Sequence, residues 1–289
     1  MSEISVMGLG LMGAALASQL QQGGHKMTVW NRSPEKMKPF LVEGAEGANS
    51  VVEAVMASPV IVICVEDYAI TKTLFETDEV TPHLRDRIIV QLSTGTPNDA
   101  AESSEWFSQF GARYIDGAIL AGPGNLATDY AKVILGGPEQ AFREAEPQLS
   151  SLCCNVLYLG ENIRAASALD LAWLCQHYGM FMAVTHGAVI CESEGVGLDL
   201  YAQTLPETEY AHAYIDKIHN EDFLNTTATL STWATAFQSI SRQALDSGIN
   251  TEVPQLVSSL FDRALAAGHG DEDVTALFKT MRKKPSRIV

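Results

Sequence analysis

The sequence has little of what marks several large classes of protein. Its five cysteines form no CxxC pair and no zinc-type spacing with histidine. An odd, scattered set of cysteines is typical of reduced thiols packed as small apolar side chains, so we expect a cytoplasmic protein without a metal site. The N-terminus lacks a basic segment followed by a long apolar run, which predicts that no signal peptide is present.

Positive charge is also scarce. The 289 residues include 19 Lys and Arg against 35 Asp and Glu, for a formal charge of -16 at pH 7. Because phosphate contacts need clustered basic residues, this balance argues against a nucleic-acid-binding protein. The longest apolar stretch, residues 165–190, is interrupted by Asp170, His177 and His186. It therefore predicts a buried helix and not a membrane span.

Short β-branched runs alternate with helical patterns in the first half of the chain. We expect strands at 4–8, 26–30, 60–65, 87–92, 113–116, 132–136 and 155–160, and helices at 11–22, 34–44, 50–57, 97–110 and 139–151. This alternation is typical of a parallel sheet covered on both faces. Only helical patterns follow, at 164–193, 228–247, 252–267 and 271–283. The predicted fold class is α/β, with an N-terminal Rossmann domain over residues 1–162 and a C-terminal all-α domain over residues 163–289.

The helix expected at 164–193 joins the two domains directly, because no flexible linker separates them. Its sequence is apolar on nearly every side. Such a helix must also be covered on every side, and we expect a second subunit to contribute to that cover. The sequence therefore predicts an intertwined homodimer.

The turn GLGLMG places three glycines in the GxGxxG spacing, directly after a strand and at the start of a helix. That context is typical of a dinucleotide-binding turn. Glycine lets the backbone approach a pyrophosphate, and the helix N-terminus offers free N–H groups and a partial positive charge. We expect the cofactor to contact Gly8, Leu9, Gly10, Leu11 and Met12.

The second strand ends in WNRSPEK, without the carboxylate that would accept from the ribose hydroxyl of NAD. The residues there are Asn31, Arg32, Ser33 and Lys36. A guanidinium, a hydroxyl and an ammonium suit a 2′-phosphate. NADPH is therefore the expected cofactor.

Two further strand ends should border the same crevice, since ligands of open α/β sheets lie at the carboxyl ends of the strands. Cys64 and Val65 follow one strand, and Ser93 and Thr94 follow another. For the second, two interpretations stay open. Its hydroxyls could border the nicotinamide, or Ser93 or Thr96 could cap the helix that begins near residue 97.

The segments GLGLMGAALASQL, GHKMTVWNRSPEK and STGTP resemble the β-hydroxyacid dehydrogenase, or 6-phosphogluconate dehydrogenase-like, superfamily. The resemblance implies a Rossmann domain, a helical domain and an interdomain helix that interlocks two subunits, with the active site at their interface. Hydroxyacid-oxidising members carry a lysine on that helix. They also carry a serine–glycine–glycine turn that grips the substrate carboxylate.

This sequence departs at both places. The lysine position falls at or next to Asp170, and AILAGPGN, which contains Ala121, replaces the polar turn. In both respects the chain resembles the imine reductases and reductive aminases, several of which have a tyrosine where Tyr178 stands. The closing segment GHGDEDVTALFKTMRK also looks like that family. The resemblance implies Asp170 and Tyr178 as catalytic residues. We also expect Ala121, in the altered turn, and Trp233, on a later helix, to line the substrate pocket.

A carboxylate suits imine chemistry because the reactive form of an imine is the protonated iminium. At about 4 Å and an effective dielectric near 20, that attraction is worth roughly 4 kcal/mol, whereas a lysine would oppose the cation. Asp170 could donate a proton to the imine nitrogen or hold the iminium as an anion, and its apolar surroundings should raise its pKa. Three alternatives also stay open: His177 as a second proton-transfer group, and Tyr178 and Trp233 as ordinary core aromatics.

The sequence therefore predicts NADPH-dependent reduction of imines or iminium ions to amines, with reductive amination left open. One alternative is a β-hydroxyacid or short aldehyde dehydrogenase of the parent superfamily, against which the missing lysine and the altered turn argue. The other is a protein that binds NADPH without catalysis.

Overall fold

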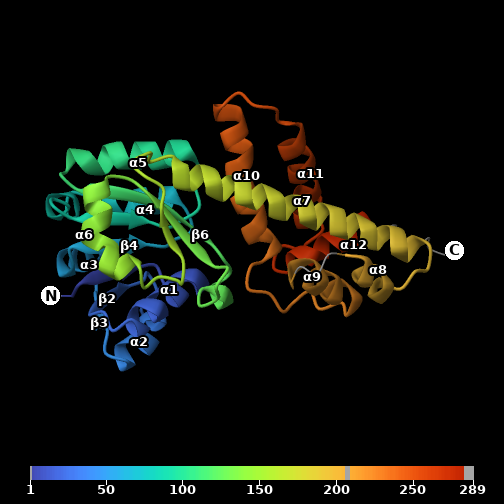
Figure 1. The fold of residues 1–289 in the computed structure, drawn as a ribbon, viewed down its shortest axis with the longest axis horizontal. Helices are drawn as coiled ribbons and strands as arrows, with labels where there is room; N and C mark the ends of the chain where they lie inside the picture. Colours follow the sequence, from blue (N-terminus) through green and yellow to red (C-terminus); the bar gives the residue numbers. More distant parts are fainter. Residues whose placement is uncertain (1, 206–208, 283–289) are drawn as a thin grey trace. The chain divides into compact units, whose positions relative to one another are not determined.

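A computed structural model describes residues 2–205 and 209–282 (Figure 1). The chain forms two compact units, and the division lies inside helix α7 (Ala165–Ser193), after Leu171. The sequence predicts a boundary just before this helix, after residue 162. No helix in the described ranges combines the length and the apolar character that a bilayer crossing requires.

The first unit is built on an eight-stranded sheet with the strand order β3-β2-β1-β4-β5-β6-β7-β8. Neighbouring strands run parallel, except that β6 and β7 pair antiparallel. The strands are β1 (Ile4–Met7), β2 (Met27–Trp30), β3 (Glu46–Gly47), β4 (Val60–Ile63), β5 (Ile88–Gln91), β6 (Arg113–Leu120), β7 (Lys132–Gly136) and β8 (Val156–Tyr158).

The antiparallel pair corrects the expectation of a wholly parallel sheet. Strand β6 continues to Leu120, beyond its predicted end, and only the short helix η3 (Pro123–Asn125) precedes β7. A connection without a crossover helix returns the chain beside β6 in the opposite direction. The apolar pattern of β7 is compatible with either direction, so the sequence alone does not distinguish them.

Helices cover both faces of this sheet. Alternate strand residues point to opposite faces. Val6 and Val62 therefore pack in one core with α1 and α6, while Met7 and Ile63 pack in a second core with α3, α4 and α5. The helices of this unit are α1 (Leu11–Gln22), η1 (Pro34–Met37), α2 (Lys38–Val42), α3 (Val51–Ala57), α4 (Tyr68–Phe75), η2 (Thr81–His83), α5 (Pro97–Gln109) and α6 (Glu139–Leu149).

The strand register places the ends of several strands in one row. Trp30 pairs with Met7, Met7 with Ile63, Ile63 with Gln91, and Gln91 with Asp116. The loops that follow β1, β2, β4 and β5 therefore leave the sheet at one edge, called the carboxyl edge below. Strand order reverses between β1 and β4, the place where open α/β sheets bind their ligands.

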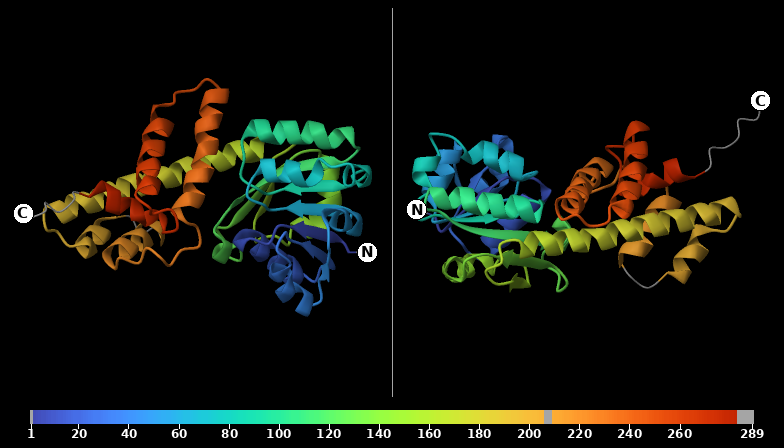
Figure 2. Two further views of the ribbon diagram at one scale, coloured as in Figure 1. Left: turned by 180° about the vertical axis from the view of Figure 1, so that it is seen from behind. Right: turned by 90° about the horizontal axis from the view of Figure 1, so that it is seen from above.

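Helices make up the second unit. They are the remainder of α7, then α8 (Leu198–Thr204), α9 (Glu209–His219), α10 (Leu230–Asp246), α11 (Glu252–Ala266), η4 (Val274–Ala276) and α12 (Leu277–Met281). Helices α10 and α11 form a hairpin whose arms lie side by side in both views of Figure 2. Tyr178 packs edge-on against Phe181, Phe237 and Phe261 in the core of this unit.

Candidate active site

The glycine turn after β1 is so tight that only glycine fits at two of its positions. Gly8 has a φ of 95°, and a Cβ placed there would lie 2.2 Å from the carbonyl oxygen of Cys64. A Cβ on Gly13 would lie 2.0 Å from the carbonyl oxygen of Gly8. At Gly10, by contrast, a Cβ would meet nothing within 4 Å. The backbone at Gly10 therefore faces open space that a ligand can occupy.

Helix α1 begins at this turn without a side-chain cap, because its N-cap is Gly10. Helices α3, α4 and α5 are instead capped by the side chains of Ser50, Asp67 and Thr96. The first N–H groups of α1 and the positive end of its dipole are thus available to an anion. Leu11, the first residue of the helix, is 65% exposed, and Met12 after it is half-buried.

Asn31 connects the end of β2 to the glycine turn. The Leu9 N–H donates to Asn31 Oδ1 at 2.8 Å, and Asn31 Nδ2 donates to the Ser33 carbonyl at 3.0 Å. Asn31 thereby fixes both the turn and the start of the segment that follows β2.

The polar side chains of that segment are exposed. In the described chain neither Arg32 nor Lys36 has a carboxylate partner, although Lys38 pairs with Glu35 at 2.5 Å. Two cations that no described carboxylate neutralises, together with the Ser33 hydroxyl, lie in the segment that Asn31 ties to the glycine turn, and such a group fits a phosphate on the ribose. The chain's own residues therefore match the two anionic parts of NADPH.

The loops after β4 and β5 are joined to each other. The Val65 N–H donates to Ser93 Oγ at 3.0 Å, and Ser93 is only 5% exposed. Of the two interpretations left open by the sequence, capping belongs to Thr96, which forms a capping box with Asp99 at the start of α5. Thr94 lies half-buried between them. Burial raises the pKa of the Cys64 thiol to about 12, so that thiol is not a nucleophile.

Asp116 is a carboxyl group at the carboxyl edge that the sequence did not single out. It lies on β6 opposite Gln91 and is completely buried. Its two oxygens accept hydrogen bonds from the hydroxyls of Tyr68 in α4 and Ser167 in α7. Burial raises the pKa of Asp116 to about 7, although these hydrogen bonds act in the opposite direction. Gly95 makes room for Tyr68, since a Cβ there would lie 2.3 Å from the ring.

Asp170 lies one helical turn after Ser167 on α7 and is 6% exposed. In the part of the chain that the structure describes, no group donates a hydrogen bond to its carboxyl group, and no Lys or Arg pairs with it. Burial, and secondarily the charge of Asp116, raise the pKa of Asp170 to about 7. Near neutral pH the carboxyl group is therefore present in both protonation states.

Tyr178, His177 and Trp233 lie in the second unit. Tyr178 is 1% exposed, and its hydroxyl donates to the Trp233 carbonyl. Its ring also packs edge-on against the Trp233 ring at 5.7 Å. His177 Nδ1 lies 3.0 Å from the carbonyl oxygen of Trp173, one turn earlier in the same helix. The structure thus brings Tyr178 and Trp233 together within an aromatic cluster.

Comparisons with known proteins match both halves of the chain. Residues 3–160 match the NAD binding domain of 6-phosphogluconate dehydrogenase, and residues 162–283 match the C-terminal domain of the NADPH-dependent reductive aminase-like family. An imine reductase from Myxococcus stipitatus, solved in complex with NADP+, is 31% identical, with 97% of this chain and 100% of that chain covered and a TM-score of 0.69. The chain belongs to the imine reductase and reductive aminase family.

Two reductive aminases are similar over nearly the whole chain. The NADPH-dependent reductive aminase of Aspergillus oryzae is 29% identical over 96% of both chains. A reductive aminase from Aspergillus terreus, solved with NADPH4, cyclohexanone and allyl amine, is 30% identical, with 97% of this chain and 99% of that chain covered and a TM-score of 0.65. The family predicted from the sequence and the predicted pairing of a Rossmann domain with a helical domain are confirmed.

Ala121 follows the end of β6 and is 7% exposed. Neither it nor Gly122, the N-cap residue of η3, carries a hydroxyl that could bind a carboxylate. A small apolar residue thus follows β6 at the position of the turn that the sequence singled out, and its place in the substrate pocket stays a prediction.

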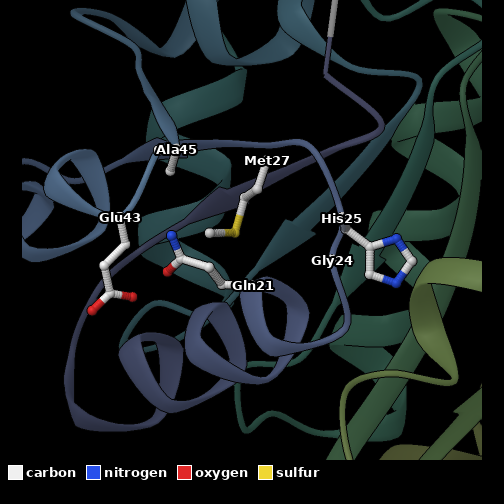
Figure 3. Close-up of a pocket in the computed structure, with 7 residues that line it drawn as sticks. Gln21, Gly24, His25, Met27, Glu43 and Ala45 are labelled. Atoms are coloured by element: carbon white, nitrogen blue, oxygen red, sulfur yellow. The ribbon is translucent and has the colours of Figure 1, made fainter.

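A shallow surface pocket of about 190 Å³ lies away from these groups (Figure 3). Met27, the first residue of β2, lines the pocket. Asn31, at the carboxyl edge, comes directly after Trp30, the last residue of the same strand. The pocket is thus at the opposite edge of the sheet and takes no part in the candidate site. Its lining consists of Gln21, Gly24, His25, Met27, Glu43, Gly44 and Ala45.

Sequence reasoning missed Tyr68, Asp116 and Ser167 as parts of this site. The signal for Asp116 was a carboxylate inside an apolar strand, RYIDGAIL, where burial without partners is costly. Tyr68 and Ser167 had no local signal, because their roles depend on contacts made across the fold.

Proposed function

We propose that this protein is an NADPH-dependent reductase that adds hydride to the carbon of an imine or iminium ion and releases an amine. The observation that carries the proposal is the state of Asp170. It is a buried carboxyl group without a cationic partner in the described residues, on a sheet unit whose carboxyl edge fits a phosphorylated dinucleotide.

The sign of the charge at position 170 distinguishes a site suited to imine reduction from one suited to carbonyl reduction. Reducing a carbonyl builds negative charge on oxygen, which a lysine would stabilise. Reducing an iminium removes positive charge from nitrogen, so the substrate is best held by an anion. Asp170 supplies that anion, and its low exposure strengthens the attraction by excluding water.

Asp170 can also handle the proton that imine reduction requires. With a pKa raised to about 7, its carboxyl group carries a proton in a large fraction of molecules at neutral pH. It can deliver this proton to the imine nitrogen and then face the iminium as a carboxylate. Both roles left open by the sequence are therefore available to one side chain.

NADPH supplies the hydride, and the chain's residues bind and orient it. Gly8, Leu9, Gly10, Leu11 and Met12 would hold the pyrophosphate at the uncapped start of α1. Arg32, Ser33 and Lys36 would hold the 2′-phosphate, with Asn31 fixing the segment. Cys64, Val65, Ser93 and Thr94 would border the nicotinamide end.

We propose Tyr178 as a second catalytic residue and Ala121 and Trp233 as walls of the substrate pocket. The contact between Tyr178 and the Trp233 carbonyl supports a joint role, because any movement of one aromatic residue would move the other. The same contact would also suit a purely structural pair. Tyr178→Phe keeps the ring and removes only the hydroxyl, so a loss of turnover without a loss of stability would identify a chemical role.

We also propose a cytoplasmic homodimer with its active site at the subunit interface. The five cysteines are all free, as expected in a reducing compartment. Large apolar side chains are exposed around the tip of the α10–α11 hairpin, each at least 60%: Leu245, Ile249, Val253 and Leu256. Such a patch calls for a partner surface, and a second copy of this chain is the partner we propose. A monomer across a dilution series in light scattering would overturn the dimer.

The function is tested with a substrate panel. Cyclic imines, ketone-plus-amine mixtures and β-hydroxyacids are each offered with NADPH and with NADH. We expect turnover of cyclic imines with NADPH, and the mixtures report whether imine formation is also catalysed. Activity confined to hydroxyacids would reject the proposal, and NADPH binding without any turnover would favour a non-catalytic module.

A further inference from the structure

Asp116 and Asp170 are two buried carboxyl groups in one small region of the first unit. Asp116 is fully buried and Asp170 is 6% exposed. Ser167, which donates to Asp116, lies one helical turn before Asp170, so the two side chains leave the same face of α7. The contact between β6 and the first turn of α7 thus fixes the position of Asp170.

The two carboxyl groups differ in their hydrogen bonds. Asp116 accepts from the Tyr68 and Ser167 hydroxyls, while no described group donates to Asp170. Hydrogen bonds from donors favour a charged carboxylate, and a nearby negative charge disfavours a second one. Asp116 should therefore ionise first, and its charge should then oppose ionisation of Asp170.

The other described groups that contact or pair with Asp116 are neutral. Tyr68 of α4 and Tyr114 of β6 are phenols whose pKa is raised well above its usual value, chiefly by burial. Gln91 of β5 faces Asp116 across the strand pair and donates to Thr71. On the other side of β6, Asp116 pairs with Gly136 of β7. Among these described groups, the two carboxyl groups are the ones whose charge can change near neutral pH.

We propose that Asp116 is a positioning residue that acts through Asp170: its carboxylate anchors the first turn of α7, and its negative charge keeps the proton on Asp170. This inference rests on the proposed function, because it gives Asp116 and Asp170 different roles in imine reduction. Asp116 carries the charge, and Asp170 carries the proton that the imine nitrogen receives.

The test is Asp116→Asn, which removes the charge and keeps the shape. Asp170 should then lose its proton more readily, and the midpoint of the pH profile of kcat should move down by about one unit, whichever form of Asp170 reacts. Glu43→Gln, an exposed change of the same charge, should leave the profile in place. In an Asp170→Asn background the further change at Asp116 should add no shift. A lower kcat with an unmoved midpoint would overturn the proposal.

A second measurement, the stability of the folded protein as a function of pH, does not depend on enzymatic turnover. Both carboxyl groups have a pKa raised to about 7 in the folded chain, above that of an unfolded Asp, so folding takes up protons. Stability should therefore fall as pH rises from about 4 to about 7, and level off above. In Asp116→Asn the decrease in stability with rising pH should be smaller, and it should end at a lower pH than in the unaltered protein.

Asp170→Asn leaves only the fall due to Asp116, which should end at lower pH because Asp116 is the first of the two groups to ionise. If Asp116→Asn does not fold, Asp116→Ser, a smaller neutral replacement, takes its place in both measurements. Melting temperatures across this pH range decide the matter even if no imine is reduced. If the decrease in stability of the Asp116 variant became smaller but still ended at the same pH, the coupling would be rejected while the proposed function stayed intact.

Discussion

The two units treat a buried aspartate in opposite ways. In the second unit Asp273 is 8% exposed and saturated: it accepts from Lys217 Nζ at 2.6 Å and from the Thr275 N–H and hydroxyl at 3.0 and 2.9 Å. In the first unit Asp170 is buried to a similar degree, and no described group donates to it. Similar burial thus accompanies two different chemical states.

The same contrast holds for the neighbouring charges. Glu272 pairs with Lys279 at 2.5 Å and also contacts the His269 ring at 3.0 Å, so this carboxylate of the second unit has partners within the chain. At the carboxyl edge of the first unit, Arg32 and Lys36 lack carboxylate partners in the described chain. A network that satisfies its own charges stabilises the fold. Charges that the chain leaves without partners are available to a ligand, and this difference locates the site.

The largest expected effect is at Asp170. Asp170→Asn should reduce imine turnover by about 100-fold or more, the usual contribution of a positioned acid. Stability at pH 7 should stay the same or rise, because a buried carboxyl group that lacks donors is removed. NADPH affinity, measured by fluorescence titration, should be unchanged.

Unchanged turnover in this variant would contradict the role assigned to Asp170. A large loss of stability would do so as well, since it would place Asp170 with Asp273 among the structural aspartates.

The next effect is on the cofactor. Arg32→Ala should weaken NADPH binding by about tenfold or more, since a charge-assisted contact to the 2′-phosphate is lost, and should change NADH binding little. Lys38→Ala is the matched control, because Lys38 already pairs with Glu35 in the same segment. Dissociation constants for both cofactors and both variants give the comparison. Equal losses for NADPH and NADH would argue against a phosphate contact at Arg32.

Local patterns predicted much of this arrangement. The glycine turn, the strands on either side of it and helix α1 follow from residue spacing alone. Asn31 and Ser93 follow the ends of β2 and β5, as that spacing predicts. Helix α4 was missed although Asp67, whose side chain accepts from the Ile70 N–H, is an ordinary N-cap signal. The sequence also predicted no helix where α8 and α9 lie, between residues 193 and 228.

The role of Asp116 could not be predicted for a different reason. Its two hydrogen-bond partners, Tyr68 and Ser167, lie 48 and 51 residues away in the sequence. A pattern read over a short stretch of sequence therefore cannot include all three residues. The direction of β7 is a similar case, because an apolar strand reads the same in either orientation. Local chemistry thus located the cofactor turn, whereas the charge balance around Asp170 depends on tertiary contacts.

The smallest expected effect is at Asp273. Asp273→Asn can keep an acceptor oxygen for Thr275, but it replaces the charged oxygen that accepts from Lys217, whose side chain is 29% exposed, with an amide NH₂ that cannot accept. Because water screens a pair of this exposure, we expect a loss of about 1 kcal/mol, or roughly 2–4 °C in melting temperature for a chain of this size. Turnover per folded molecule should be unchanged, in contrast to Asp170→Asn. A variant that melted normally but lost most of its turnover would show that a saturated carboxylate can also serve the reaction, and the contrast between the two units would no longer locate the site.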